Sequence, residues 1–231
     1  MVTYTWSKSI DDASGTQTWM GGLSTLQDPN NLKLERSLSS FDLPHVFQFS
    51  YTYELPVGRG KALGSKMNPV LNAIIGGWQT NGTWRFNSGR PEALMLQSGG
   101  LNFPTYGGQR PDLVGTLNCA SGSWASKLNQ YFANPQVLTT PAPFTEGTAS
   151  RTDGSCRQPG AKNANLSIFK EFPLSRLREG ARIEFRFETY NALNHPQFGG
   201  PNTTLNSGSF GVITNQVNFP REAQGALKVY W

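Results

Sequence analysis

Long apolar segments are absent from this 231-residue chain. No run approaches the roughly 18 to 20 consecutive apolar residues that a membrane-spanning helix requires. No secretory leader is recognisable either, because Met1 is followed at once by an alternating segment rather than by a basic and then an apolar region. We therefore expect either a cytosolic protein or a chain whose true N-terminus is missing.

Cysteine is scarce, with only Cys119 and Cys156 in the chain. Neither belongs to a CxxC pair or lies near a histidine, so neither predicts a metal site. Two cysteines in loop-like sequence favour one disulfide bond and an oxidising compartment such as a periplasm or a cell surface. Two free thiols are the alternative interpretation.

Catalytic and metal-binding motifs are also absent. The two histidines, His45 and His195, lie at the ends of expected strands without a Cys, Asp or Glu at ligand spacing, so we expect turn residues rather than metal ligands. Asp11, Asp12 and Asp28 do not match the calcium-loop pattern. There is no GxSxG, no HExxH and no phosphate-binding glycine loop, so we expect no enzyme activity and no cofactor.

Charge is modest, at 15% of residues, and the net charge of +5 comes from 20 basic and 15 acidic side chains. The basic residues are scattered. Their densest cluster, residues 176–182, also contains Glu179. A mixed cluster of this kind is typical of a solvated turn, so we expect no nucleic-acid binding.

The clearest positive signal is the alternation of apolar and charged residues over 182–188. Successive side chains of a strand point to opposite faces, so Ile183, Phe185 and Phe187 share one face. A helical face recurs at every third or fourth residue and does not separate these sets. The segment predicts a strand between an apolar and an aqueous medium.

Five further segments alternate in the same way, with aromatic or aliphatic side chains at every second position. The six expected strands cover residues 2–7, 45–55, 78–87, 163–172, 182–194 and 223–231. One or two helical turns are expected at residues 69–75. With 25 glycines, 15 prolines and 12% aromatic residues, the composition suits many strands joined by polar loops. The sequence thus predicts an all-β antiparallel meander.

The connections between these strands alternate in length. They are long after the first, third and fifth strands and shorter after the second and fourth. The largest irregular region, about residues 96–161, holds both cysteines. Such a loop is unusual in a compact soluble domain and ordinary on the outer side of a membrane barrel. We expect part of a transmembrane β-barrel with long extracellular loops and short periplasmic turns, and the longest loop as the candidate for substrate contact.

Short motifs follow one another in a shared order along most of the chain. They are YTWSKSIDD (4–12), FD (41–42) with His45, YTYELP (51–56), GGWQ (76–79), SGRP (88–91), RQPG (157–160), NLSIFK (165–170) and YNALNHP (190–196). In this order they resemble the C-terminal barrel region of TonB-dependent outer-membrane receptors. The closest likeness is to the Oar-like branch, whose members contain a carboxypeptidase-regulatory-like domain.

The resemblance implies an outer-membrane barrel of about 22 strands that encloses a plug domain. Such receptors import scarce substrates, such as metal chelates or oligosaccharides, with energy passed on by TonB. Residues 1–231 would form a single domain, the C-terminal part of that barrel. The implied partners are the rest of the barrel and its plug, TonB indirectly, the barrel-assembly machinery and outer-membrane lipid.

The resemblance also implies roles for individual residues. The side chains expected to face lipid are Phe47, Phe49, Tyr51, Tyr53, Ile183, Phe185 and Phe187. Those expected to face the lumen are Arg85, Arg182, Glu184, Arg186 and Glu188. The C-terminal assembly signal would be formed by Leu227, Val229 and Trp231. The luminal charges would either line a substrate path or pair with neighbouring strands and the plug.

The chain lacks the plug, the TonB-contacting segment and the earlier barrel strands of that family. We therefore expect a fragment that is inactive as a transporter alone. Two other kinds of protein are alternative interpretations. One is a soluble or surface β-sandwich binding module, and the other is a pore subunit that contributes strands to an oligomeric barrel. A sandwich requires the aromatic faces of its sheets to pack on each other as a core.

Overall fold

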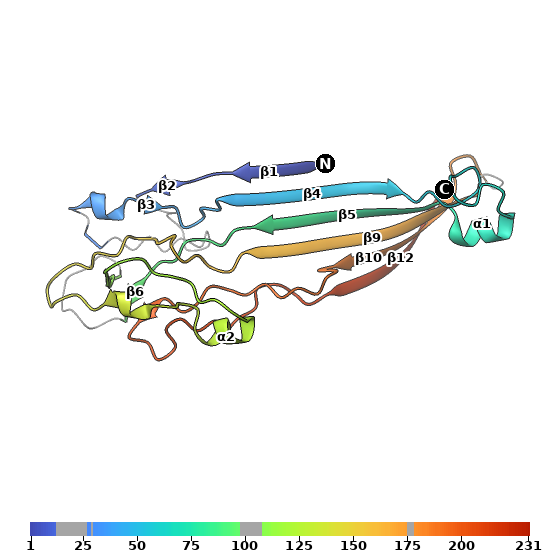
Figure 1. The fold of residues 1–231 in the computed structure, drawn as a ribbon. Coiled ribbons are helices and arrows are strands. Elements are labelled where there is room, and N and C mark those ends of the chain that lie inside the picture. Colours follow the sequence, from blue (N-terminus) through green and yellow to red (C-terminus); the bar gives the residue numbers. More distant parts are fainter. Residues whose placement is uncertain (13–26, 29, 98–107, 175–177) are drawn as a thin grey trace.

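Six long strands form one antiparallel sheet in the computed structural model, which describes residues 1–12, 27–28, 30–97, 108–174 and 178–231. The strands are β1 (Val2–Trp6), β4 (His45–Glu54), β5 (Trp78–Asn87), β9 (Ala161–Pro173), β10 (Arg182–Tyr190) and β12 (Glu222–Tyr230). Each pairs with the next long strand along the chain, in the order β1-β4-β5-β9-β10-β12 (Figure 1). The predicted six-stranded antiparallel meander is confirmed.

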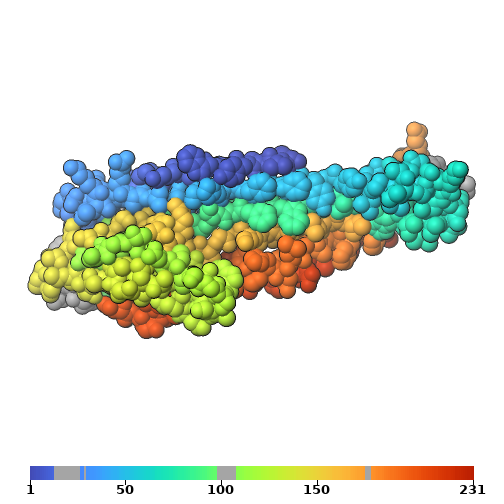
Figure 2. Space-filling model, in the orientation of Figure 1, coloured from blue at the N-terminus to red at the C-terminus, as the bar shows by residue number. Residues whose placement is uncertain are grey.

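The sheet has two different ends. At the loop end, the strands are joined by residues 7–44, 88–160 and 191–221, and at the turn end by residues 55–77 and 174–181. Figure 2 shows most of the bulk outside the sheet at the loop end, where residues of the yellow-green part of the chain gather. The helix α1 (Pro69–Ile75) lies at the turn end, as expected from the sequence.

Short elements occupy the loop end. They are the two-residue strands β2 (Ile10–Asp11), β3 (Ser37–Leu38), β6 (Met95–Leu96), β7 (Asp112–Leu113), β8 (Leu138–Thr139) and β11 (Thr204–Leu205), the helix α2 (Trp124–Asn129) and the 3-10 turns η2 (Leu32–Glu35) and η3 (Pro135–Val137). The described residues of the region 96–161, which was expected to be irregular, are therefore organised by short pairings such as β7 with β8. Within the described residues, no helix is long and apolar enough to cross a membrane.

The strand register gives the sheet one apolar and one polar face. Residues directly opposite in a ladder project to the same side, as Phe47 and Phe86 do between β4 and β5. The apolar face carries Val2, Tyr4, Trp6, Phe47, Phe49, Tyr51, Tyr53, Trp78, Trp84, Phe86, Leu166, Ile168, Phe172, Ile183, Phe185, Phe187, Leu227 and Val229. The polar face carries Gln48, Ser50, Thr83, Arg85, Asn163, Asn165, Ser167, Arg182, Glu184, Arg186, Glu188, Gln224 and Lys228.

A glycine in β5 allows close packing on the apolar face. Gly82 lies between Tyr51 of β4 and Leu166 of β9. A Cβ atom at Gly82 would come within 2.6 Å of the Tyr51 ring and 2.8 Å of a Leu166 methyl group. Only glycine leaves this space free, so the Tyr51 ring lies over the backbone of β5.

The strand ends differ slightly from the expected ones. The fifth strand was expected to continue through residues 189–194, but β10 ends at Tyr190. Asn191 and Asn194 have φ values of 47° and 49°, a left-handed conformation that breaks a strand and that asparagine tolerates. Of the charged turn expected at 175–180, residues 175–177 lie outside the described part of the chain, as do residues 13–26 and 29 of the expected first long loop.

Candidate functional site

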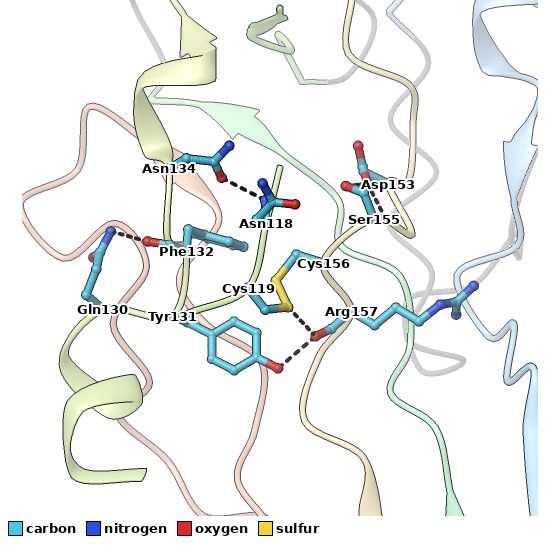
Figure 3. Close-up of a disulfide and its surroundings, with 10 residues drawn as sticks. All are labelled: Asn118, Cys119, Gln130, Tyr131, Phe132, Asn134, Asp153, Ser155, Cys156 and Arg157. Carbon is cyan, nitrogen blue, oxygen red and sulfur yellow. Dashed lines mark hydrogen bonds between the residues drawn. A yellow bond between two sulfur atoms is a disulfide. The ribbon is translucent and has the colours of Figure 1, made fainter. Parts of the chain in front are cut away.

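The loop end contains a disulfide-linked group of loops. Cys119 and Cys156 form a disulfide with a Cα–Cα distance of 5.0 Å, which confirms the predicted pairing (Figure 3). Beside it, the Tyr131 hydroxyl donates to the carbonyl oxygen of Arg157 at 2.8 Å. These contacts attach residues 119–131 to the segment that leads into β9. We call the described residues of 7–44 and 88–160 the loop assembly.

The loop assembly has its own apolar core, which the sequence did not predict. The buried cluster consists of Leu94, Leu117, Tyr131, Phe132, Leu138, Cys156 and, from the last connection, Ile213. Phe132 is fully buried and stacks on Phe210 at a ring-centroid distance of 5.2 Å. No side chain of the apolar sheet face belongs to this cluster. The loops are therefore packed as a small folded body whose core is separate from the sheet's apolar face.

Three arginine–carboxylate pairs connect the two parts of the loop assembly. In each, an arginine from residues 88–160 pairs with an acid from residues 7–44. The pairs are Arg110 with Glu35, Arg151 with Asp11, and Arg157 with Asp42. The carboxyl groups of Glu35 and Asp42 are almost completely buried, at 0% and 1% side-chain exposure. A buried charge of this kind requires a partner, so the pairs fix how the two loops lie together.

Neutral hydrogen bonds reinforce the same junction. The Gln27 side chain donates to the carbonyl oxygen of Gly147 at 2.9 Å and accepts from the backbone N–H of Arg110 at 3.0 Å. The Thr152 hydroxyl donates to the carbonyl oxygen of Leu38. None of these contacts could be predicted from the sequence, because the partners lie far apart in polar loops without a periodic pattern.

Glu92 is a buried acid that belongs to none of the three ion pairs. Its side chain accepts a hydrogen bond of 3.4 Å from Gln158, while its Oε1 atom is buried and has no hydrogen-bond partner among the described residues. Burial is the main cause that raises the pKa of Glu92 to about 8. The hydrogen bond from Gln158 lowers this pKa by a smaller amount, and the negative charge of Asp153 raises it further. Burial, and secondly the nearby Glu92, raise the pKa of Tyr131 to about 12. Glu92 is therefore largely protonated at neutral pH.

The charges expected to face the lumen lie together on the polar face. Arg186 donates to Glu184 at 2.7 Å and to Glu188 at 3.3 Å, both within β10. Arg182 pairs with Glu171 of β9 at 3.4 Å. The alternating charges thus neutralise one another within β10 and across to β9. This arrangement agrees with the pairing interpretation rather than with a row of free charges.

Arg85 lies apart from these pairs. It is exposed on the polar face of β5, opposite Gln48 of β4 and Asn163 of β9. These three residues line a hollow of about 340 Å³ together with Ser50, Thr83 and Asn165. Amide, hydroxyl and guanidinium groups are gathered here without an acid, which suits hydrogen bonding to a polar or anionic solute.

The residues expected to face lipid all lie on the apolar face. Large side chains there are exposed in the sheet, among them Tyr53 (52%), Phe185 (38%) and Phe187 (42%). The predicted assembly-signal residues Leu227 and Val229 lie on the same face of β12, and Trp231 follows the strand. The structure thus brings the two predicted sets to opposite faces of one sheet.

The histidines and loop acids take structural positions. The Nδ1 atom of His45 lies 2.8 Å from the Tyr4 hydroxyl. Asp11 pairs with Arg151, and Asp28 accepts from the backbone N–H of Asn30 at 2.8 Å. In the described part of the chain, no group of three or more His, Cys, Asp or Glu side chains is arranged to hold a metal ion.

Comparison with known proteins gives one family. Residues 1–224 match the model of a family described as an outer membrane beta barrel domain. No curated protein and no solved structure matches the chain. The family match covers the first five long strands and reaches the start of β12.

Proposed function

The chain belongs to the outer membrane beta barrel domain family, and from this premise we propose that it is the C-terminal part of the barrel of a TonB-dependent receptor. The family match locates the chain in the outer membrane, as part of a transmembrane β-barrel. The transport function, the TonB dependence and the Oar-like branch belong to the proposal. They rest on the order of motifs along the chain.

The exposed apolar face is the observation that carries the membrane-barrel part of this proposal. Apolar side chains of neighbouring strands continue it from β1 to β12, and Tyr4, Tyr53, Phe185 and Leu227 are all exposed on it. Soluble monomers rarely expose so large an apolar patch. In the described part of the chain, the aromatic side chains of this face do not pack on a second long-stranded sheet, as a soluble sandwich would require. Acyl chains are the medium that suits this face.

The polar face then faces the barrel lumen. Its charges at 182–188 are largely paired, which suits a wall against a plug domain, and the hollow beside Arg85 gives the lumen a polar surface. The loop assembly stands at the extracellular end, where recognition loops of outer-membrane barrels lie. We propose an import role for scarce polar substrates, with no catalytic activity and no cofactor in this chain.

Photo-crosslinking in the complete outer-membrane protein tests the two faces. A benzoylphenylalanine at Phe185 is expected to crosslink to lipid, and one at Thr83 of the polar face to polypeptide in the lumen. Lipid crosslinks at both positions, or protein crosslinks at both, would contradict a filled barrel. Transport is tested by deleting the gene of the complete outer-membrane protein and measuring growth on candidate substrates. On the imported substrate, the growth defect should equal that of a TonB deletion, and the double deletion should grow no worse than either single deletion.

A strand-contributing pore subunit is the second candidate. Its support is that β1 and β12 each pair with only one other long strand among the described residues. Open edges readily pair with further strands, including those of other copies. A native mass spectrum of the membrane-extracted protein separates the two: a ring of identical chains supports the pore, and one longer chain supports the receptor.

A further inference from the structure

The short helix α1 at the turn end has one apolar and one polar side. Its aliphatic residues Val70, Leu71, Ile74 and Ile75 follow the spacing of a single helix face. All four are exposed, with Val70 at 72% and Ile74 at 63%. A helix in water would not gather its aliphatic side chains on the exposed side.

The opposite side of α1 is attached to the turn that carries it. Asn68 caps the helix by accepting from the backbone N–H of Leu71 at 2.7 Å. The Asn72 side chain accepts from the backbone N–H of Arg59 at 2.7 Å. These contacts orient the helix so that its aliphatic side stays outward.

Two residues of the apolar sheet face hold α1 beside that face. Lys170 of β9 donates to the carbonyl oxygens of Ala73 at 2.7 Å and Asn72 at 3.1 Å. The indole N–H of Trp78 donates to the carbonyl oxygen of Ile74 at 2.9 Å. Trp78 in turn packs edge-on against Phe185 at 6.0 Å between ring centroids. The helix α1 is therefore attached to the turn end of the apolar sheet face.

Basic residues border the helix in the same turn. Arg59 and Lys66 are exposed, and Lys61 pairs with Glu54 at 2.8 Å. A short helix with an aliphatic side and flanking basic residues is typical of segments that lie in the interface of a membrane. Basic side chains there attract the phosphate groups of lipids.

We propose that α1 is a membrane-interface anchor that inserts Val70, Leu71, Ile74 and Ile75 between the headgroups and acyl chains of the leaflet at the turn end. In the orientation of the proposed function this is the periplasmic leaflet, and Arg59 and Lys66 lie at its headgroup phosphates. The inference rests on the proposed function for the lipid contact of the apolar face. The anchor would be a second contact with phospholipid, in addition to the sheet face, at the depth where headgroups meet acyl chains.

Depth-dependent fluorescence quenching tests the anchor. The complete outer-membrane protein is reconstituted in phosphatidylethanolamine–phosphatidylglycerol vesicles with nitroxide lipids labelled near the headgroup. An environment-sensitive dye is attached to Ile74→Cys, to Val70→Cys as a second helix position, or to Val114→Cys as control, because Val114 is exposed in the loop assembly at the opposite end of the sheet. Folding of each variant is checked by heat-modifiable gel migration. We expect several-fold stronger quenching at positions 74 and 70 than at position 114.

A reference position separates this inference from the proposed function. The same dye at Phe185→Cys should be quenched by nitroxides placed deep in the acyl chains. Quenching at 185 without quenching at 70 and 74 overturns the anchor and leaves the barrel proposal standing. Absence of quenching at all of these positions overturns the lipid contact of the sheet itself. Shielding of position 74 from both nitroxide lipid and aqueous iodide overturns the anchor in favour of a protein partner.

Discussion

Lys170 donates from its Nζ atom to the carbonyl oxygen of Ala73 at 2.7 Å, so a cation on the apolar face of β9 is bound to the helix α1. The side chain also lies over the rings of Trp78 and Phe172, at 5.8 and 5.1 Å from their centroids. Ring faces and peptide carbonyls together replace the water that an ammonium group loses in this position. The lysine is thereby accommodated on a surface that otherwise excludes charge.

Replacing Lys170 by Met should release α1 from the sheet. Two hydrogen bonds from a charged donor are lost, and we expect a local destabilisation of about 1–3 kcal/mol. Hydrogen exchange of the amides of residues 71–76 in reconstituted protein measures the effect. Lys162→Met is the matched control, because Lys162 lies on the same face of β9 at the loop end and is exposed. Equal exchange in the two variants would contradict the role of Lys170.

The two faces of β10 should respond differently to substitution. Arginine at Phe185 places a charge among the exposed aromatic side chains of the apolar face and should destabilise the folded protein by about 2–4 kcal/mol if the site lies near the bilayer midplane. Glu184→Gln retains one acceptor oxygen for Arg186, and its amide can donate to the Tyr230 hydroxyl, so it should cost about 1 kcal/mol. Urea titrations of folding into vesicles compare the two, and equal penalties would argue against a two-sided sheet.

Glu92 should make the loop assembly less stable at high pH. Its pKa is raised from 4.5 to about 8 in the folded protein, so the folded state holds the proton more tightly than the unfolded state. Stability is complete below pH 4.5, falls as the pH rises toward 8, and is then lower by about 5 kcal/mol. Limited proteolysis of the loop assembly across this range measures the fall. The Glu92→Gln variant should lack this component, and an unchanged pH profile in that variant would exclude Glu92 as its source.

Reduction of the Cys119–Cys156 disulfide should loosen the loops and leave the sheet intact. The bond closes a loop with a sequence separation of 37, which corresponds to about 3–4 kcal/mol of unfolded-state entropy. We expect faster protease cleavage within residues 88–160 after reduction, with unchanged heat-modifiable migration of the barrel. The Cys119→Ser/Cys156→Ser double variant should behave like the reduced protein whether or not reductant is present.

The Arg110–Glu35 pair offers a double-mutant cycle. Arg110→Leu leaves the fully buried Glu35 carboxylate without this cation and should destabilise the loop assembly by about 3–5 kcal/mol. Glu35→Leu is the second single substitution of the cycle, and Arg110→Leu combined with Glu35→Leu removes both charges and should be less destabilising than Arg110→Leu alone. Protease susceptibility of the junction between residues 27–38 and 108–113 provides the measurement. Additive effects would mean that the two side chains do not depend on each other.

The sheet could be predicted because its pattern is local. A two-residue period over 182–188 determines a strand and both of its faces, and the same period recurs in five other segments. The disulfide was predictable because the chain has only two cysteines. Neither inference required knowledge of distant contacts.

The loop assembly could not be predicted for the opposite reason. Its ion pairs join residues separated by 75, 115 and 140 positions, and its core draws single apolar residues from several polar stretches. No period in the sequence marks such residues. The role of Glu92 could not be predicted either, since only the fold shows that its side chain is buried. The anchor helix was expected as a helix, but its orientation depends on Lys170, almost a hundred residues later.

The three arginine–carboxylate pairs have a mechanical consequence for the loop end. A pull on residues 7–44 is transmitted to residues 88–160 through three attachment points, and from there through the disulfide toward β9. Separating the two loops would require the displacement of several buried charges at once. We therefore expect the two loops to move together at the end of the sheet, so that a solute that displaces one loop also displaces the other.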